Sequence, residues 1–151
     1  ARFCEVRHGL KVGADGGCFE AALRAVRTYG GVIEHPAFSK AWANYGLPRP
    51  DTKHHGWTAG TCGGYSCYIE QCRYGHPVKK ATWLYVYGVP RNELPELRWG
   101  YTPDSRGTIS QNQDWRGGMD KWRDSTGHRA ANATPPDFRD VLLAIAQRAN
   151  K

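Results

Sequence analysis

The feature that most constrains this chain is a helical pattern that stops at a glycine pair and gives way to a short apolar strand. In residues 18–29 apolar side chains recur at i, i+3, i+4 and i+7, which predicts a helix with one buried face. These side chains are Phe19, Ala22, Leu23 and Val26. Gly30 and Gly31 end the helix, and residues 32–33 predict a very short strand. A helix joined to a buried strand is typical of an α/β sheet, in which ligand sites form beyond the strand ends.

Further predicted elements follow along the chain. We expect a short helix over residues 37–45, a long surface loop over 46–64, and strands over 65–71 and 82–87 that bracket the basic turn RYGHPVKK. Residues 91–132 are polar and predict an extended insertion. Thr134 is expected to cap a terminal helix that two prolines open. Together these predict a single α/β domain over 1–151, with a partial Rossmann-like sheet, flanking helices and a long polar loop.

The charge of the chain favours a polyanionic partner. Lys and Arg outnumber Asp and Glu by 21 to 14 among 151 residues, which gives a formal charge of +7. An excess of this kind attracts nucleic acid through steering and counterion release, so nucleic acid is the first partner to consider; the alternative is a basic protein without such a partner. The polar insertion holds Trp99, Trp115 and Trp122, whose rings either stack on unpaired bases or pack beneath a loop.

The cysteines indicate a reducing compartment. There are five, an odd number without a disulfide pattern, and no secretory segment precedes them, so we expect a cytoplasmic protein. No apolar run approaches the ~20 residues that a membrane helix needs. Zinc is an alternative that uses Cys62, Cys67 and Cys72 beside two histidines, but structural zinc sites favour closer pairs, and we expect no metal.

Two groups of polar residues are candidates for a site. Glu34 follows the short strand and precedes His35 and Pro36, where it either meets a ligand or caps the next helix. The basic turn gathers charged and polar donors that suit a phosphate or a base edge, unless the turn is simply solvated. Its candidate residues are Gln71, Arg73, His76, Lys79 and Lys80.

Three segments together resemble the late part of the catalytic domain of phage-type and prophage-type cytosine-5 DNA methyltransferases. The segment GGVIEHPAFSKAW resembles an I-E-N-P segment, with His35 where asparagine is usual. The segment EQCRYGHPVKKATWLYVYG resembles a Q…F-G-H-P…K-K-T…L segment, and RAANATPPDFRDVLLAIA more loosely resembles a closing helix.

The resemblance implies a Rossmann-like sheet that binds S-adenosylmethionine. It also implies that Glu34 holds the ring nitrogen of a flipped cytosine and that Arg73 contacts its carbonyl oxygen, so both become candidate catalytic residues. Gln71, His76, Lys79 and Lys80 would then contact the nucleic acid. The P-C nucleophile segment and the glycine-rich cofactor turn of such enzymes are missing, so we expect that the N-terminal cofactor-binding segment lies before residue 1.

Two functions follow from these observations. The first is a methyltransferase-like domain that handles cytosine but is inactive alone, as a fragment or as half of an enzyme whose sheet a second chain completes. The alternative is a non-catalytic basic phage protein that binds nucleic acid or inhibits a host defence complex.

Overall fold

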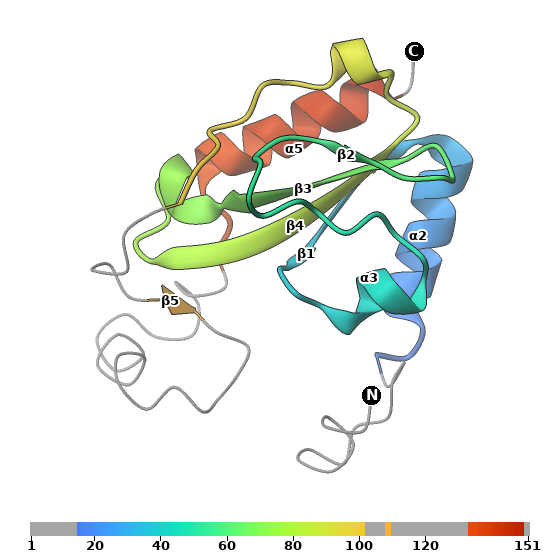
Figure 1. Ribbon diagram of the computed structural model, residues 1–151, viewed down its shortest axis with the longest axis horizontal. Helices are drawn as coiled ribbons and strands as arrows, with labels where there is room; N and C mark the ends of the chain where they lie inside the picture. The colour runs from blue at the N-terminus through green and yellow to red at the C-terminus, as the bar shows by residue number, and fades with distance from the viewer. Residues whose placement is uncertain (1–14, 102–107, 110–132, 150–151) are drawn as a thin grey trace.

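The computed structural model describes residues 15–101, 108–109 and 133–149, which form a sheet with helices on both faces (Figure 1). In chain order the elements are α2 (Cys18–Tyr29), β1 (Gly31–Pro36), α3 (Lys40–Asn44), β2 (Thr58–Ala59), β3 (Tyr65–Glu70), the 3₁₀ turn η1 (Gln71–Tyr74), β4 (Lys79–Tyr87), the 3₁₀ turn η2 (Arg91–Glu93), β5 (Thr108–Ile109) and α5 (Pro136–Arg148). The prediction of a mixed α/β chain is therefore confirmed.

The helix α2 has the predicted bounds and ends where the glycine pair begins. Gly30 adopts a φ of 77° and donates its N–H to the carbonyl of Val26, which closes the last turn. A side chain at Gly30 would also overlap Ala149, at the end of α5, so glycine lets the two helix ends approach closely. Leu23 is buried as expected, whereas the prediction that Ala22 is buried is wrong, because that residue faces solvent.

The sheet has the order β1-β4-β3-β2, and every pairing along this path is antiparallel. The short β5 pairs in parallel with β4 at Lys79 and Lys80. Because β4 lies antiparallel between β1 and β3, these two strands run parallel to each other, and the connection between them carries α3. A Rossmann-like sheet is normally parallel throughout, so this arrangement confirms an α/β sheet without confirming the Rossmann-like prediction.

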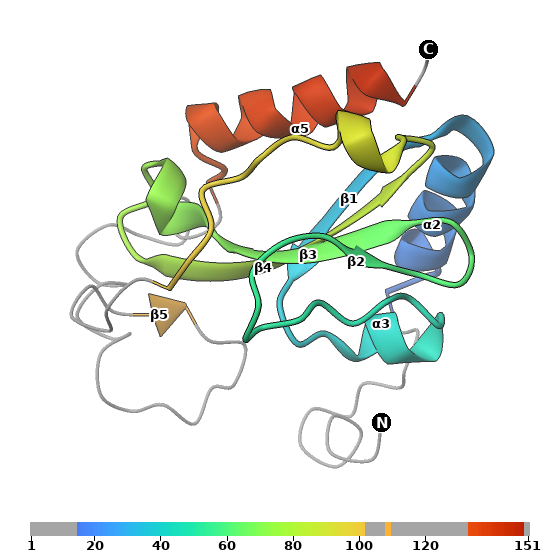
Figure 2. The same ribbon diagram turned by 45° about the horizontal axis from the view of Figure 1, so that its top comes forward.

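The two faces of the sheet bury separate cores, which alternate along β4. One face carries Leu84 and Val86, and Phe138 and Ile145 of α5 pack against it. The other face carries Trp83 and Tyr85, against which α2 and α3 pack. Figure 2 shows α5 and α3 on opposite sides of the sheet. Neighbouring residues of β4 therefore face different surroundings, which decides where its two lysines lie.

Several boundaries differ from the sequence prediction. β1 spans Gly31–Pro36 and not residues 32–33 alone, so Glu34 lies within the strand and not after it. β4 begins at Lys79, so the two lysines belong to a strand and not to the turn. The helix α3 starts only at Lys40, after Ser39, whose hydroxyl accepts the N–H of Ala41. Pro135, and not Thr134, occupies the N-cap of α5.

The predicted polar insertion begins as ordered structure. Residues 91–101 contain η2, and they bury Leu94 and Leu97 in the α5 face of the sheet. The apolar side chains of this segment, hidden among charges in the sequence, explain its order. Of the remaining insertion, β5 is the only described part, and Trp115 and Trp122 lie outside the described residues. No helix within the described ranges is long and apolar enough to cross a membrane.

Candidate nucleic-acid-binding site

Glu34 and Gln71 meet on the α5 face of the sheet. Glu34 lies on β1 opposite Leu84 and is half-buried, while Gln71 opens η1 directly after β3 and has no exposed surface. The Gln71 amide Nε2 donates to Glu34 Oε1 at 3.0 Å and to Thr82 Oγ1 at 3.0 Å. A buried amide thus ties β1 to β4, and it fixes the carboxylate in one position.

Two acceptor groups of this cluster have hydrogen-bonding capacity that the described residues do not use. Gln71 Oε1 is buried and has no hydrogen-bond partner in the described part of the chain. Among the described residues Gln71 is also the only hydrogen-bond donor to Glu34, whose carboxylate has two oxygens. Buried acceptors are normally satisfied, so Gln71 Oε1 is an exception, and the half-buried Glu34 carboxylate is the acceptor of this cluster that a ligand can reach.

Lys80 adds a cation to the same face. Its Nζ donates to the carbonyl of Ala133, just before α5, at 3.3 Å. Burial lowers the pKa of the Lys80 ammonium, and the nearby charge of Glu34 opposes this effect by raising it. We call the four residues Glu34, Gln71, Lys80 and Thr82 the Glu34–Gln71 site.

Lys79 lies on the opposite face, in a different environment. Its Nζ pairs with Glu70 Oε1 at 3.2 Å, and the Glu70 side chain is fully buried. The same carboxylate accepts the hydroxyl of Tyr68 at 2.8 Å, and burial, followed by this contact with Glu70, raises the pKa of Tyr68 far above its usual value. The predicted pair of nucleic-acid-binding lysines is therefore split between the two faces of the sheet.

The other two predicted residues of the turn point elsewhere. His76 is buried, and its Nδ1 lies 2.8 Å from the carbonyl of Val78 and 3.3 Å from the Val78 N–H, so the ring braces the turn before β4. Arg73 is exposed, and its guanidinium lies against Gly100. The structure thus brings Gln71 and Lys80 to Glu34, and it places Arg73, His76 and Lys79 in other surroundings.

A cysteine that the sequence did not single out as a nucleophile has an activating environment. Cys62 is exposed in the loop between β2 and β3; Arg27 Nη2 lies 3.5 Å from its Sγ, and the Tyr85 hydroxyl lies 3.8 Å away. Partial burial alone would raise the pKa of this thiol, but Tyr85, the Gly64 N–H and Arg27 outweigh it and lower the pKa. Arg27 is 35 positions away in the sequence, so only the tertiary structure reveals this cluster.

The cysteines do not converge as the zinc alternative requires. Cys67 is buried in the α5 face, where burial raises the pKa of its thiol well above the usual value. Cys72 lies on η1, and its Sγ is 3.9 Å from Glu70 Oε2. No group of three metal-ligating side chains occurs among the residues that the structure describes.

Trp99 packs edge-on against Trp57 with ring centroids 6.1 Å apart. This contact agrees with the alternative in which the Trp99 ring packs beneath a loop.

Comparison with known proteins finds no match among family models, curated proteins or solved structures.

Proposed function

We propose that this chain binds DNA, holds an unpaired cytosine at the Glu34–Gln71 site and has no catalytic activity of its own. The observation that carries the proposal is the hydrogen bond between Gln71 and Glu34. It joins two of the three segments on which the resemblance to cytosine-5 methyltransferases rests, although 37 positions separate the two residues.

The chemistry of the cluster suits the edge of cytosine. A carboxylate accepts from the N4 amino group of cytosine, and thymine presents an acceptor at the equivalent position. Lys80 supplies a donor for an oxygen of the base or of a phosphate, and the formal charge of +7 favours the DNA backbone in general. The site therefore favours cytosine over thymine through Glu34.

No strand-to-helix connection within the described residues carries the glycine-rich turn that the resemblance implies for S-adenosylmethionine. The resemblance predicts a glycine-rich turn from a strand into a helix, yet β1 leads to α3 through Ala37, Phe38 and Ser39. In the described part of the chain β4 leads to η2 through Gly88-Val89-Pro90. Neither connection has this form, and calorimetry of this chain with S-adenosylmethionine tests the predicted cofactor binding.

The proposal also includes a Rossmann-like sheet, which the family resemblance implies. What supports it is the parallel relation of β1 and β3 and the connection through α3, since parallel strands need such a crossover. What weighs against it is the antiparallel β4 between them. A partner chain that extends the sheet, and the alternative of a host defence target, stay predictions.

Fluorescence anisotropy with two labelled single-stranded oligonucleotides tests the function. One carries a single cytosine in a thymine background, and the other carries thymine only. We expect tighter binding of the first, and Glu34→Gln should remove about tenfold of this preference, because one good base contact discriminates by about 1–3 kcal/mol. Glu20→Gln is the matched control, because Glu20 is an exposed carboxylate on α2. Equal affinities of the wild type for both oligonucleotides would overturn the proposal.

A further inference from the structure

Six aromatic rings form a continuous row on the face of the sheet opposite α5. The distances between the centroids of consecutive rings are 5.5 Å for Trp42 and Trp83, 5.4 Å for Trp83 and Phe38, and 6.2 Å for Phe38 and Tyr68. They are 5.5 Å for Tyr68 and Tyr101 and 5.0 Å for Tyr101 and His55. Each spacing lies in the range of favourable ring contacts, about 4.5–7 Å. We call this set the aromatic row.

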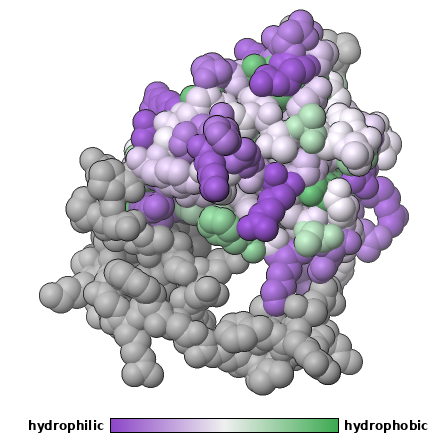
Figure 3. Space-filling view, viewed as in Figure 1, coloured by the Kyte–Doolittle hydropathy of each residue, from purple (hydrophilic) through white to green (hydrophobic). Residues whose placement is uncertain are grey.

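The row has a rigid base and two exposed members. Trp42, Trp83 and Tyr68 are each at most 3% exposed, whereas Phe38 is 60% and Tyr101 is 49% exposed. Tyr68 lies between the two exposed rings and contacts both. Buried rings thus support two solvated aromatic surfaces that are one ring apart. Figure 3 shows apolar residues at the surface among hydrophilic ones on the side of the molecule that carries α3.

The backbone holds Phe38 outward at a conformational cost. Its φ of 65° makes it the only non-glycine residue with positive φ among those described. A bulky side chain disfavours this conformation, and such residues gather at functional sites. The neighbours fix it, since the Ala37 N–H donates to the carbonyl of Ala81 on β4 and Ser39 caps α3. Hydrophobic burial does not explain this arrangement, because the ring remains mostly exposed.

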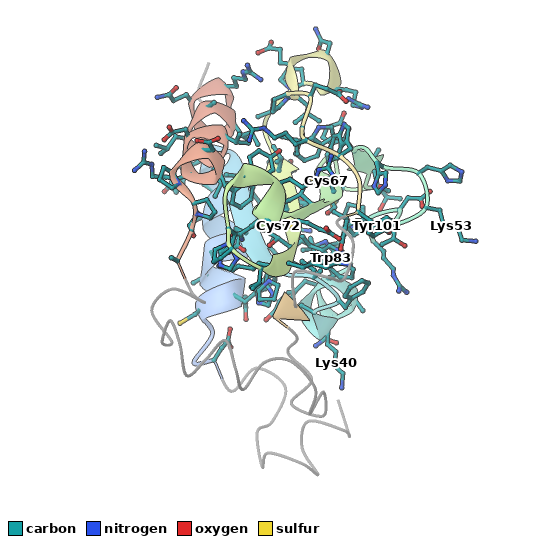
Figure 4. All side chains as sticks on the ribbon, turned by 90° about the vertical axis from the view of Figure 1, so that its left-hand side faces the viewer. Lys40, Lys53, Cys67, Cys72, Trp83 and Tyr101 are labelled. Atoms are coloured by element: carbon teal, nitrogen blue, oxygen red, sulfur yellow. The ribbon has the colours of Figure 1, made fainter. Side chains whose placement is uncertain are left out.

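Cations surround the row. Lys79 Nζ lies 5.6 Å from the centroid of the Tyr101 ring. The Tyr101 hydroxyl donates to the carbonyl of Thr52, the residue before Lys53, and Lys40 follows Phe38 by two positions. Figure 4 shows Lys40 and Lys53 projecting outward on different sides of Trp83 and Tyr101.

Of the acids near the row, Glu70 forms an ion pair with Lys79, and Asp51 keeps one negative charge against the two cations Lys40 and Lys53. Asp51 accepts the backbone N–H groups of Lys53 and His54. The surface around the two exposed rings therefore combines stacking faces with positive charge. This combination matches single-stranded nucleic acid, whose bases offer ring faces and whose backbone is anionic. In a duplex, by contrast, the ring faces are stacked inside the helix.

We propose that the aromatic row binds single-stranded nucleic acid, with Phe38 and Tyr101 stacking on unpaired bases and Lys40 and Lys53 contacting phosphates. This inference rests on the proposed DNA binding and specifies that the bound DNA is single-stranded. The Glu34–Gln71 site lies on the other face of the sheet, so the two contacts can be tested separately. Stacking on aromatic side chains is tolerant of sequence, whereas Glu34 discriminates between bases.

The test measures binding of a thymine-only single strand, which offers Glu34 no cytosine. Phe38→Leu and Tyr101→Leu keep an apolar side chain but remove the ring, and each should weaken binding roughly 5- to 150-fold, as expected for the loss of one stacked base. Tyr29→Leu is the matched control, because Tyr29 is 74% exposed on α2 but lies outside the row. Tyr101→Phe keeps the ring and should retain the affinity.

Several outcomes separate the two proposals. Unchanged thymine-strand affinity in both Phe38→Leu and Tyr101→Leu, with circular dichroism matching the wild type, overturns the aromatic row as a binding surface. Duplex DNA that binds as tightly as the single strand overturns it too, as does a wild type that binds no oligonucleotide. If these leucine variants lose binding while cytosine preference is absent from the wild type, the row stands and the cytosine site fails. The reverse pattern leaves the cytosine site and removes the row.

Discussion

Lys79 compensates a carboxylate that has no exposed surface. Its Nζ lies 3.2 Å from Glu70 Oε1, and its own side chain is 17% exposed. At an effective dielectric constant of about 20, unit charges at this separation attract by about 5 kcal/mol. Lys79→Met keeps a long side chain but leaves the buried carboxylate without its cation, a change that costs about 3–5 kcal/mol in buried pairs. Because Lys79 retains some contact with water, we expect a loss near 3 kcal/mol.

Chemical and thermal unfolding measure this loss. For a chain of this size 1 kcal/mol shifts the Tm by about 2–4 °C, so Lys79→Met should lower the Tm by about 6–12 °C. Adding Glu70→Gln removes the uncompensated charge and should restore most of the stability, because the amide oxygen still accepts from Tyr68. Lys53→Met, at an exposed position, should change the free energy of unfolding by no more than about 0.5 kcal/mol.

Two results would refute this reasoning. A Lys79→Met variant as stable as Lys53→Met would mean that the ion pair contributes nothing net. A double variant no more stable than Lys79→Met alone would mean that the loss comes from packing of the Lys79 side chain and not from the charge left on Glu70.

Three further predictions concern the loop regions. Cys62 should react with iodoacetamide at neutral pH faster in the wild type than in Arg27→Ala, because Arg27 helps to lower the thiol pKa; Arg24→Ala, on the same helix, should leave the rate unchanged, and equal rates in all three would contradict the proposed environment. Gly64→Ala should destabilise the protein by about 1–3 kcal/mol in urea unfolding, because the new methyl group would overlap the Tyr85 ring; an unchanged midpoint would show that the loop gives way. Hydrogen bonds from the His54 N–H, the His54 ring and the Lys53 N–H lower the pKa of Asp51 to about 2 from 3.8, so its contribution to stability is complete above the unfolded value and is lost as pH falls toward 2; an NMR titration midpoint near 3.8 would exclude these bonds.

Local patterns predicted the helices better than the strands. The bounds of α2 follow from its apolar period and from Gly30, both of which act within one turn. The start of β4 did not follow, because Pro77 and two lysines read as a turn, and only pairing with β5 extends the strand to Lys79. The antiparallel insertion of β4 is likewise set by long-range pairing, which no short segment encodes.

The candidate site was predictable only in part. Gln71 follows β3 directly, as the rule that sites form at strand ends predicts, whereas Glu34 was expected after a strand and lies within β1. The split of Lys79 from Lys80 follows from strand alternation, but only once both are known to be in a strand. Nothing in the sequence indicates the positive φ of Phe38, because phenylalanine is among the residues least expected to adopt it.

The central position of β4 also sets the order in which this sheet can form. Among the described strands, β1, β3 and β5 all pair with β4, and only the two-residue β2 pairs elsewhere. During synthesis β1 and most of β3 therefore have no strand to pair with until residues 79–87 have emerged from the ribosome. A chain truncated before residue 79 lacks α5 and has almost no sheet, and it exposes the edges of β1 and β3 to aggregation.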